Sequence, residues 1–489
     1  MPEKKSFIKI GVIYAIGQVL GKALSFFLLP VYTRQLGSSG YGQLALVDTV
    51  LDFVGAFVIC GIYSGYYRFY REYDENQRKT LKNTAINFAL ILAVFDILFV
   101  ILFGKPISKI IFKFDNSYKI LILVVIRSII VQFVTLFMCD YTLNYQAVIS
   151  VTTNLVNLVL NLTLSIFFVA YKKQGIIGVY KGYIYSNAVV LIYLVIVNCK
   201  SYRFEFDKGM LKNMLKFSNG LIPGSIASTI LTLSDRYFLA GYKSYSETGV
   251  YSMGYKFGML IEPLFIVPFK SVFTPYKFEI WKDDDAEIKF NNMFDKYNFL
   301  GLFILLGISI YSKFVISIFT TKEFINAYKI VPLILFSYFL YGKADFFSLG
   351  IQIRNKTYID SFIMLFGGVS NIILNALFIP KYGMYGATFA TVLSYIVMNF
   401  AYLKIAMPLY HVKYNFKKVS YFYSITLFLY IIYYYISIKN IKPILECIIG
   451  FILLILYVVL CLVFKLVKKE TLKSYYNKFT KKINIKFNI

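Results

Sequence analysis

Histidine, paired cysteines and phosphate-binding loops are scarce or missing in this sequence, and each shortage excludes a kind of chemistry. The 489 residues include one histidine, His411, and five cysteines with no Cys-x-x-Cys pair. These residues form neither a zinc pattern nor a Ser/His/Asp or Cys/His catalytic site. A glycine-rich phosphate-binding loop, which marks many ATP-driven proteins, is also missing. We therefore predict no metal, no cofactor and no enzymatic activity.

Charged residues are few as well, and hydrophobic residues are abundant. Only 16% of the residues are charged and 58% are hydrophobic, with a mean hydropathy of +0.64. A soluble chain carries about 25% charged residues. A soluble chain with this composition could not bury so much apolar surface. The sequence therefore indicates an integral membrane protein. A secreted domain, a cytosolic enzyme and a nucleic-acid-binding protein are excluded, although the net charge of +27 would suggest phosphate binding in a soluble chain.

Long apolar runs follow one another along the whole chain. A helix needs about 20 apolar residues to cross a bilayer, and continuous runs favour helices because lipid cannot satisfy open strand edges. We predict an all-α polytopic membrane protein with about fourteen transmembrane helices and no inserted soluble domain. The predicted spans are 9–32, 43–66, 82–103, 118–141, 147–171, 176–198, 217–240, 249–274, 297–318, 330–352, 358–379, 383–407, 417–438 and 443–465.

Lysine and arginine are distributed unevenly over the connecting segments. With the N-terminus in the cytoplasm, the inside segments hold roughly twice as many of these residues as the outside loops, as cytoplasmic loops do. An even number of spans then places both termini in the cytoplasm. The lysine-rich end of the chain, 465–489, orients the protein or contacts anionic lipid head groups.

Short motifs recur at nearly constant separation, which predicts an internal repeat. Such a repeat of six spans keeps its orientation, so the two halves would be related by a pseudo-twofold axis along the membrane normal. We predict an N-terminal lobe at 1–200, a C-terminal lobe at 201–410, and two extra helices with the basic tail at 411–489. The matches, all offset by 208 to 214 residues, are Gly11-Val12-Ile13 with Gly220-Leu221-Ile222, Ser39-Gly40-Tyr41-Gly42 with Thr248-Gly249-Val250-Tyr251, Asn157-x-x-x-Asn161 with Asn371-x-x-x-Asn375, and Gly175-x-x-Gly178 with Gly383-x-x-Gly386.

These motifs carry a resemblance to a known family. Leu36-Gly37-Ser38-Ser39-Gly40-Tyr41-Gly42 follows the first span, and Ser234-Asp235-Arg236 precedes the run from Thr248 to Lys256. Together with the two Gly-x-x-Gly turns, they resemble the polysaccharide-biosynthesis flippases. These are the Wzx-type members of the multidrug/oligosaccharidyl-lipid/polysaccharide export superfamily, and the resemblance covers essentially the whole chain.

The resemblance implies a transporter that works by alternating access. Its substrate would be an undecaprenyl-pyrophosphate-linked oligosaccharide, moved from the inner to the outer leaflet for assembly of O-antigen, capsule or exopolysaccharide. The expected location is the bacterial cytoplasmic membrane. Membrane lipids, a glycan polymerase and glycosyltransferases are further expected partners, and nucleic acid is not.

Charges inside the predicted spans supply the candidate site residues, because intramembrane charges are costly and usually functional. Cations at mid to outer depth in both lobes would attract a pyrophosphate in a cleft between them. Each could instead pair with a carboxylate or extend toward the interface. The substrate-binding candidates are Lys22, Arg127, Arg236, Lys256 and Lys343.

Buried acids are the candidates for ion coupling: Asp52, Asp235 and Glu262. Asp235 adjoins Arg236 and Asp345 lies two residues from Lys343, so local charge compensation is the role that sequence favours for these two acids. Glu262 precedes Pro263 in mid-span, where a proline frees a backbone carbonyl and can kink the helix. A buried carboxylate there could take up a proton and couple export to an ion gradient.

Three other functions compete with this interpretation. A drug or small-cation antiporter of the same superfamily would have an acidic cavity in place of a basic one. A lipid II flippase is a second alternative, although no match to its motifs is evident. A membrane glycan polymerase or acyltransferase should carry a large outer loop or an intramembrane catalytic histidine, and neither occurs in the sequence.

Overall fold

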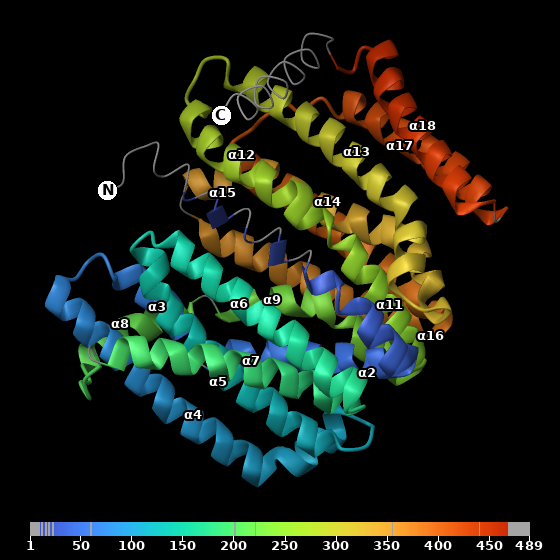
Figure 1. Ribbon diagram of the computed structural model, residues 1–489. Helices are drawn as coiled ribbons and strands as arrows, with labels where there is room; N and C mark the ends of the chain where they lie inside the picture. The colour runs from blue at the N-terminus through green and yellow to red at the C-terminus, as the bar shows by residue number, and fades with distance from the viewer. Residues whose placement is uncertain are drawn as a thin grey trace, which may run out of the picture. The chain divides into compact units, whose positions relative to one another are not determined.

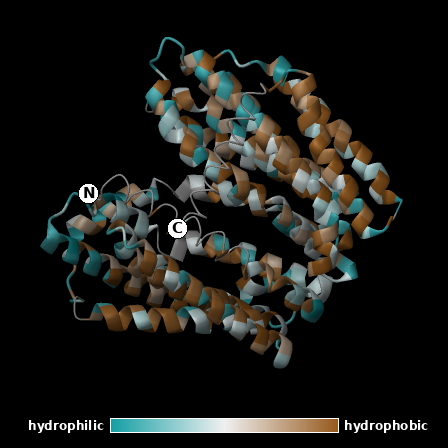
Figure 2. Cartoon of the chain, turned by 45° about the horizontal axis from the view of Figure 1, so that its top comes forward, coloured by the Kyte–Doolittle hydropathy of each residue, from teal (hydrophilic) through white to brown (hydrophobic). Residues whose placement is uncertain are grey.

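The computed structural model describes residues 10, 13–14, 17, 20–21, 24–58, 61–199, 202–220, 222–354, 356–439 and 441–467. Over these ranges the chain is almost entirely helical and contains no strand, which confirms the all-α prediction (Figure 1). Hydrophobic residues make up much of the length of the helices (Figure 2), and many large ones are exposed. On the long helix α4, for example, Phe95 and Leu102 are 61% and 70% exposed, as residues facing lipid are.

The helices follow one another with short connections. In chain order they are α2 (Leu29–Val58), α3 (Ile62–Phe69), α4 (Glu75–Ile111), α5 (Ser117–Leu143), α6 (Ala147–Ile166), η1 (Phe167–Tyr171), α7 (Gly175–Asn198), α8 (Lys208–Asn219), α9 (Ile222–Leu233), α10 (Asp235–Tyr242), α11 (Tyr245–Gly258), η3 (Glu262–Ile266), α12 (Val267–Ile280), α13 (Ala286–Phe319), η4 (Lys322–Lys329), α14 (Val331–Phe347), α15 (Leu349–Ile353), α16 (Thr357–Ala401), η5 (Tyr402–Ala406), η6 (Met407–Leu409), α17 (Phe416–Ile438) and α18 (Pro443–Val463).

Every predicted span from the second to the last overlaps a described helix, but several spans are bent or joined. Nine described helices are long and apolar enough to cross a membrane, or up to ten if the bent pair η4 and α14 is one span. Two predicted spans, 358–379 and 383–407, merge into α16. The first span, 9–32, lies largely outside the described residues. The count of fourteen therefore stays a prediction.

Glycines with positive φ start both repeated Gly-x-x-Gly motifs, and a third lies just before the repeated motif Ser39–Gly42, which is itself helical. Gly37 interrupts α2 with φ 64°, Gly175 starts α7 with φ 56°, and Gly383 breaks α16 with φ 55°. Only glycine adopts this region without steric cost. Pro263 also acts as expected, because a π-helical turn, η3, replaces regular helix between α11 and α12.

The described chain forms two compact units. Unit 1 comprises 1–252, 319–324 and 364–390, and unit 2 comprises 253–318, 325–363 and 391–489. In unit 1, α4 packs on α5, and both α5 and α6 pack on α7. Unit 2 contains an aromatic core in which the rings of Phe294, Tyr297 and Phe346 touch. The predicted lobes, 1–200 and 201–410, are a division by internal repeat and stay a prediction.

Candidate functional site

Arg127, on α5, is the centre of a cluster of aromatic and charged side chains within unit 1. Its guanidinium carbon lies 3.8 Å from the ring centre of Tyr183 and 5.4 Å from that of Tyr180, both on α7. Its Nη1 atom lies 3.5 Å from Oδ1 of Asp48, on α2, and the hydroxyl of Tyr180 donates to the same oxygen over 2.8 Å. Two rings and one carboxylate thus compensate a guanidinium that is only 16% exposed.

Several polar atoms around this cluster are buried without a hydrogen-bond partner among the described residues. They are Nε of Arg127 itself and both amide atoms of Asn161. Tyr32 lies beside Ser165, Tyr183, Asp48 and Arg127. Buried polar atoms are satisfied in nearly all proteins, so such a concentration marks a place for ligand or water.

Arg236 and Asp52 belong to the same neighbourhood. Arg236, on α10, donates from Nε to the Ser252 hydroxyl over 3.2 Å and is 8% exposed. Asp52, one turn after Asp48 on α2, is exposed and lies within electrostatic range of Asp48, Arg236 and Arg127. Unit 1 therefore brings together both predicted arginines and one predicted acid.

Asp235 lies in a fully buried polar network of unit 1. Its carboxylate accepts a hydrogen bond from Nδ2 of Asn375 over 2.7 Å and another from the Tyr251 hydroxyl. The Asn371 side chain bonds both Asn375, over 2.8 Å, and the hydroxyl of Ser234, over 3.0 Å. Asn371 and Asn375 are the pair that the repeat analysis aligned with Asn157 and Asn161.

The remaining predicted site residues are in unit 2 or outside the described chain. Lys343, on α14, is 7% exposed, donates to the Tyr423 hydroxyl over 3.1 Å and lies over the rings of Tyr423 and Phe294. Lys256 and Glu262 are half-buried, on α11 and η3. Lys22 lies outside the described residues. The substrate and ion-coupling roles of all these residues stay predictions.

Two helical turns of similar sequence pack directly against each other in unit 1: the turn that follows the break at Gly37 in α2 and the first turn of α11. A Cβ atom on Gly42 would stand 1.8 Å from the carbonyl oxygen of Tyr245, and one on Gly249 would stand 2.0 Å from that of Ser38. Each glycine thus faces the residue four positions before the other glycine. The hydroxyls of Ser38 and Ser246 are 2.7 Å apart. Each turn therefore makes the same kind of contact with the other, and the pseudo-twofold relation between the lobes stays a prediction.

A loop covers each of these turns. Glu323, in the connection after α13, accepts a hydrogen bond from the Ser38 N–H over 2.7 Å, and the neighbouring Phe324 ring packs edge-on against Tyr41. The Phe114 ring, in the connection after α4, packs edge-on against Tyr245. We name the set of these turns and loops, 37–42, 112–116, 244–249 and 319–324, the turn interlock.

Sequence reasoning missed two of the groups that define this region. Asp48 compensates Arg127, and its spacing of one helical turn from the predicted Asp52 was the available signal. Glu323 caps a turn 285 residues earlier in the chain, and no local pattern encodes that contact. Asp345, expected to compensate Lys343, forms an ion pair with Lys277 over 3.0 Å.

Comparison with solved structures identifies the fold. The chain is similar to a structure titled lipid II flippase MurJ in an inward closed conformation, with a TM-score of 0.74 and 17% identity over 92% of this chain and 98% of that chain. It is also similar to an inward-facing multidrug resistance MATE family transporter, with a TM-score of 0.64 and 14% identity over 81% of this chain and 98% of that one. A MOP superfamily transporter from Pyrococcus furiosus gives a TM-score of 0.59 and 14% identity over 83% and 96% of the two chains. The chain therefore shares the fold of these three solved structures.

The sequence itself gives the family. The pattern of the polysaccharide biosynthesis protein family matches residues 8–281, more than half of the chain. The chain belongs to this family, which confirms the resemblance found in the motifs. No curated protein matches it.

Proposed function

We propose that this protein is a flippase that moves an undecaprenyl-pyrophosphate-linked oligosaccharide across the bacterial cytoplasmic membrane. The glycan would serve assembly of O-antigen, capsule or exopolysaccharide, supplied by glycosyltransferases and consumed by a polymerase. Both termini would lie in the cytoplasm. The family and the transporter fold support this proposal.

The observation that carries the proposal is the state of Arg127. Its guanidinium is held in place by the ion pair of Nη1 with Asp48 and by two tyrosine rings, yet its buried Nε atom has no hydrogen-bond partner among the described residues. A guanidinium presents rigidly placed N–H donors that match phosphate oxygens, and charge-assisted contacts of this kind are strong. A pyrophosphate oxygen would satisfy Nε, and Arg236 lies in the same electrostatic neighbourhood.

Alternating access would use the turn interlock. The turns at Ser38 and Ser246 belong to different predicted lobes and follow spans that lead to the predicted outer side. Contacts between these turns would close that side while the site faces the cytoplasm. They would separate when the substrate leaves.

Asp235 is the best placed of the three ion-coupling candidates. Its carboxylate is fully buried and accepts hydrogen bonds from Asn375 and Tyr251, whereas Asp52 is exposed and Glu262 is half-buried. Taking up a proton or a small cation there would change the charge of a buried network. The network reaches α10 and α16 at once, so ion uptake could alter how these helices pack.

The test is surface glycan in cells that lack the chromosomal gene and carry variants at matched protein level. Arg127→Ala should reduce surface glycan about tenfold or more, because losing a charge-assisted contact costs about 1.5–3 kcal/mol. Arg127→Lys should restore export only in part, since an ammonium cannot make a two-pronged contact.

The control removes an exposed cation, Lys172→Ala, and should export normally. Accumulation of lipid-linked glycan on the inner leaflet in the Arg127→Ala cells would place the defect in transport. Normal export by Arg127→Ala would contradict the proposed role of this cluster.

A second candidate, a drug antiporter, is favoured by a different pocket of unit 1. The pocket, about 620 Å³ in volume, has an almost entirely apolar lining from α2, α4 and α5 with one charged side chain, Asp96. Oδ2 of Asp96 is buried without a hydrogen-bond partner among the described residues. Such a pocket suits a lipophilic cation. Loss of drug resistance in Asp96→Asn cells with normal surface glycan would favour this function.

A further inference from the structure

A polar pocket of about 420 Å³ lies in unit 1 where α5 and α7 end and α4 begins. It is lined by three cations, two carboxylates, two amides and two tyrosines. Asp140, in its lining, is about 20 Å along α5 from Arg127 at a rise of about 1.5 Å per residue. The pocket is therefore separate from the Arg127 cluster, and it lies on the predicted cytoplasmic side.

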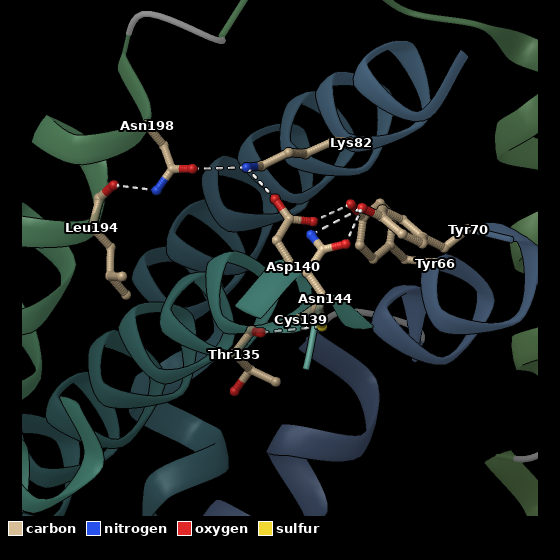
Figure 3. A network of polar contacts seen from close by, with 9 residues as sticks. All are labelled: Tyr66, Tyr70, Lys82, Thr135, Cys139, Asp140, Asn144, Leu194 and Asn198. Atoms are coloured by element: carbon tan, nitrogen blue, oxygen red, sulfur yellow. Dashed lines mark hydrogen bonds and ion pairs between the residues drawn. The ribbon is translucent and has the colours of Figure 1, made fainter. Parts of the chain in front are cut away.

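One side of the pocket is built around Asp140. Its carboxylate forms an ion pair with Lys82 and accepts a hydrogen bond from the buried hydroxyl of Tyr66 (Figure 3). Lys82 also donates to Oδ1 of Asn198 over 2.9 Å. These contacts, from α3, α4, α5 and α7, fix the side chains and let Lys82 and Asp140 compensate each other's charge.

The other side of the pocket has charges that remain available to a ligand. Arg78 donates from Nε to the carbonyl oxygen of Tyr70 over 2.8 Å, and its guanidinium lies over the Tyr70 ring at 4.9 Å. The Tyr70 hydroxyl is bonded to the amide of Asn144 over 3.2 Å (Figure 3). The bond to the Tyr70 carbonyl positions Arg78 and uses only one of the five N–H donors of the guanidinium. Lys79, the next residue, is exposed, and Glu75 is the opposing exposed carboxylate.

We propose that this pocket binds a phosphate-bearing head group that has hydroxyls beside the phosphate. The guanidinium of Arg78 and the ammonium of Lys79 would hold the phosphate oxygens. The amide of Asn144 and the carboxylate of Asp140 present the donors and acceptors that hydroxyls require. Two sources share this chemistry: a lipid-linked glycan phosphate and the glycerol phosphate head of an anionic bilayer lipid.

The first experiment measures binding of inorganic pyrophosphate to the full-length protein in phosphatidylcholine nanodiscs, by phosphorus NMR line broadening. Saturable binding is expected. The double variant Arg78→Gln/Lys79→Gln should weaken it at least tenfold, because two charge-assisted contacts are lost. Glu75→Gln should strengthen it by about threefold, since an exposed carboxylate repels the anion only weakly.

The matched control is Lys413→Gln/Lys417→Gln. These lysines are exposed, belong to unit 2 and lie on the predicted cytoplasmic side, and the double variant loses the same net charge. Its affinity for pyrophosphate should match that of the wild type. Equal weakening by both double variants, or no saturable binding to the wild type, would overturn the proposal.

A second arm separates the two sources. If the occupant is a bilayer lipid, adding phosphatidylglycerol to the nanodiscs should lower the apparent pyrophosphate affinity of the wild type more than that of Arg78→Gln/Lys79→Gln. If the occupant is the glycan phosphate, phosphatidylglycerol should affect both proteins equally, and glucose phosphate should bind more tightly than inorganic phosphate. This assay measures binding and not transport. Its result therefore tests the pocket separately from the proposed role of Arg127 in export.

Discussion

At the scale of single residues, Asp235 is a wholly buried carboxylate that already has two hydrogen-bond partners. It accepts hydrogen bonds from Tyr251 and Asn375, so an ion that binds there competes with an existing network. Residues of this kind are well suited to changing protonation or cation occupancy during a transport cycle. The three ion-coupling candidates, Asp52, Asp235 and Glu262, can be distinguished by how their variants respond to an imposed ion gradient.

We expect Asp235→Asn to abolish the response of transport to an ion gradient while the protein still folds, because the amide keeps the shape of the carboxylate. The measurement is substrate flipping in proteoliposomes with a sodium gradient and a proton gradient imposed in separate experiments. The wild type should accelerate under one of them, and Asp235→Asn should not.

Asp52→Asn and Glu262→Gln serve as comparison variants in the same assay and should keep the acceleration. A loss confined to Glu262→Gln would move the coupling site to η3. An unaltered response in Asp235→Asn would remove Asp235 from the coupling mechanism.

The residue scale also shows why charges were predicted better than their partners. Arg127, Arg236 and Asp235 could be recognised because a charge inside an apolar run is conspicuous. The partner Asp345 was assigned to Lys343 from sequence proximity, but Lys277 of α12 takes it in the structure. Partners come from tertiary packing, which residue spacing along one helix does not contain.

At the scale of elements, glycine was a dependable guide to turns and a poor guide to what packs on them. The motifs predicted tight turns, and Gly37, Gly175 and Gly383 have positive φ. Gly42 and Gly249 have a different role, because each permits close approach of the other turn's backbone. A sequence motif for flexibility and one for close packing look the same.

Close packing in the turn interlock can be tested with one added methyl group. Gly42→Ala and Gly249→Ala should each destabilise the protein by about 1–3 kcal/mol, because the new Cβ would overlap a carbonyl oxygen that cannot move freely. Thermal unfolding in detergent should show a lower melting temperature for both variants.

Gly241→Ala is the control, since a Cβ there would meet nothing within 4 Å. Alanine is the better helix former, so this variant should lose no stability. If the melting temperature of Gly42→Ala equals those of Gly241→Ala and the wild type, the two turns are not in contact in the protein.

At the scale of the whole molecule, composition predicted the class because lipid imposes a simple rule on every residue facing it. Long apolar runs had to be helices, and the described residues are helical. The boundaries of spans were less predictable, because glycine and proline join or bend helices, as in α16 and at η3. Contacts such as that between Ser38 and Glu323 depend on the path of the entire chain.

The proposed transport cycle requires that the turn interlock open and close, which a reversible cross-link can test. The Ser38 and Ser246 hydroxyl oxygens are 2.7 Å apart, so cysteines at these positions should form a disulfide with little backbone movement. In a background with the five native cysteines replaced, oxidised Ser38→Cys/Ser246→Cys should bind substrate but stop flipping it in proteoliposomes. A reductant should restore the rate, and each single-cysteine variant should flip normally with or without oxidant.

Undiminished flipping by fully cross-linked protein would mean that these turns stay together throughout transport. The outer opening would then have to form elsewhere, and the interlock would be a fixed hinge between the two repeats.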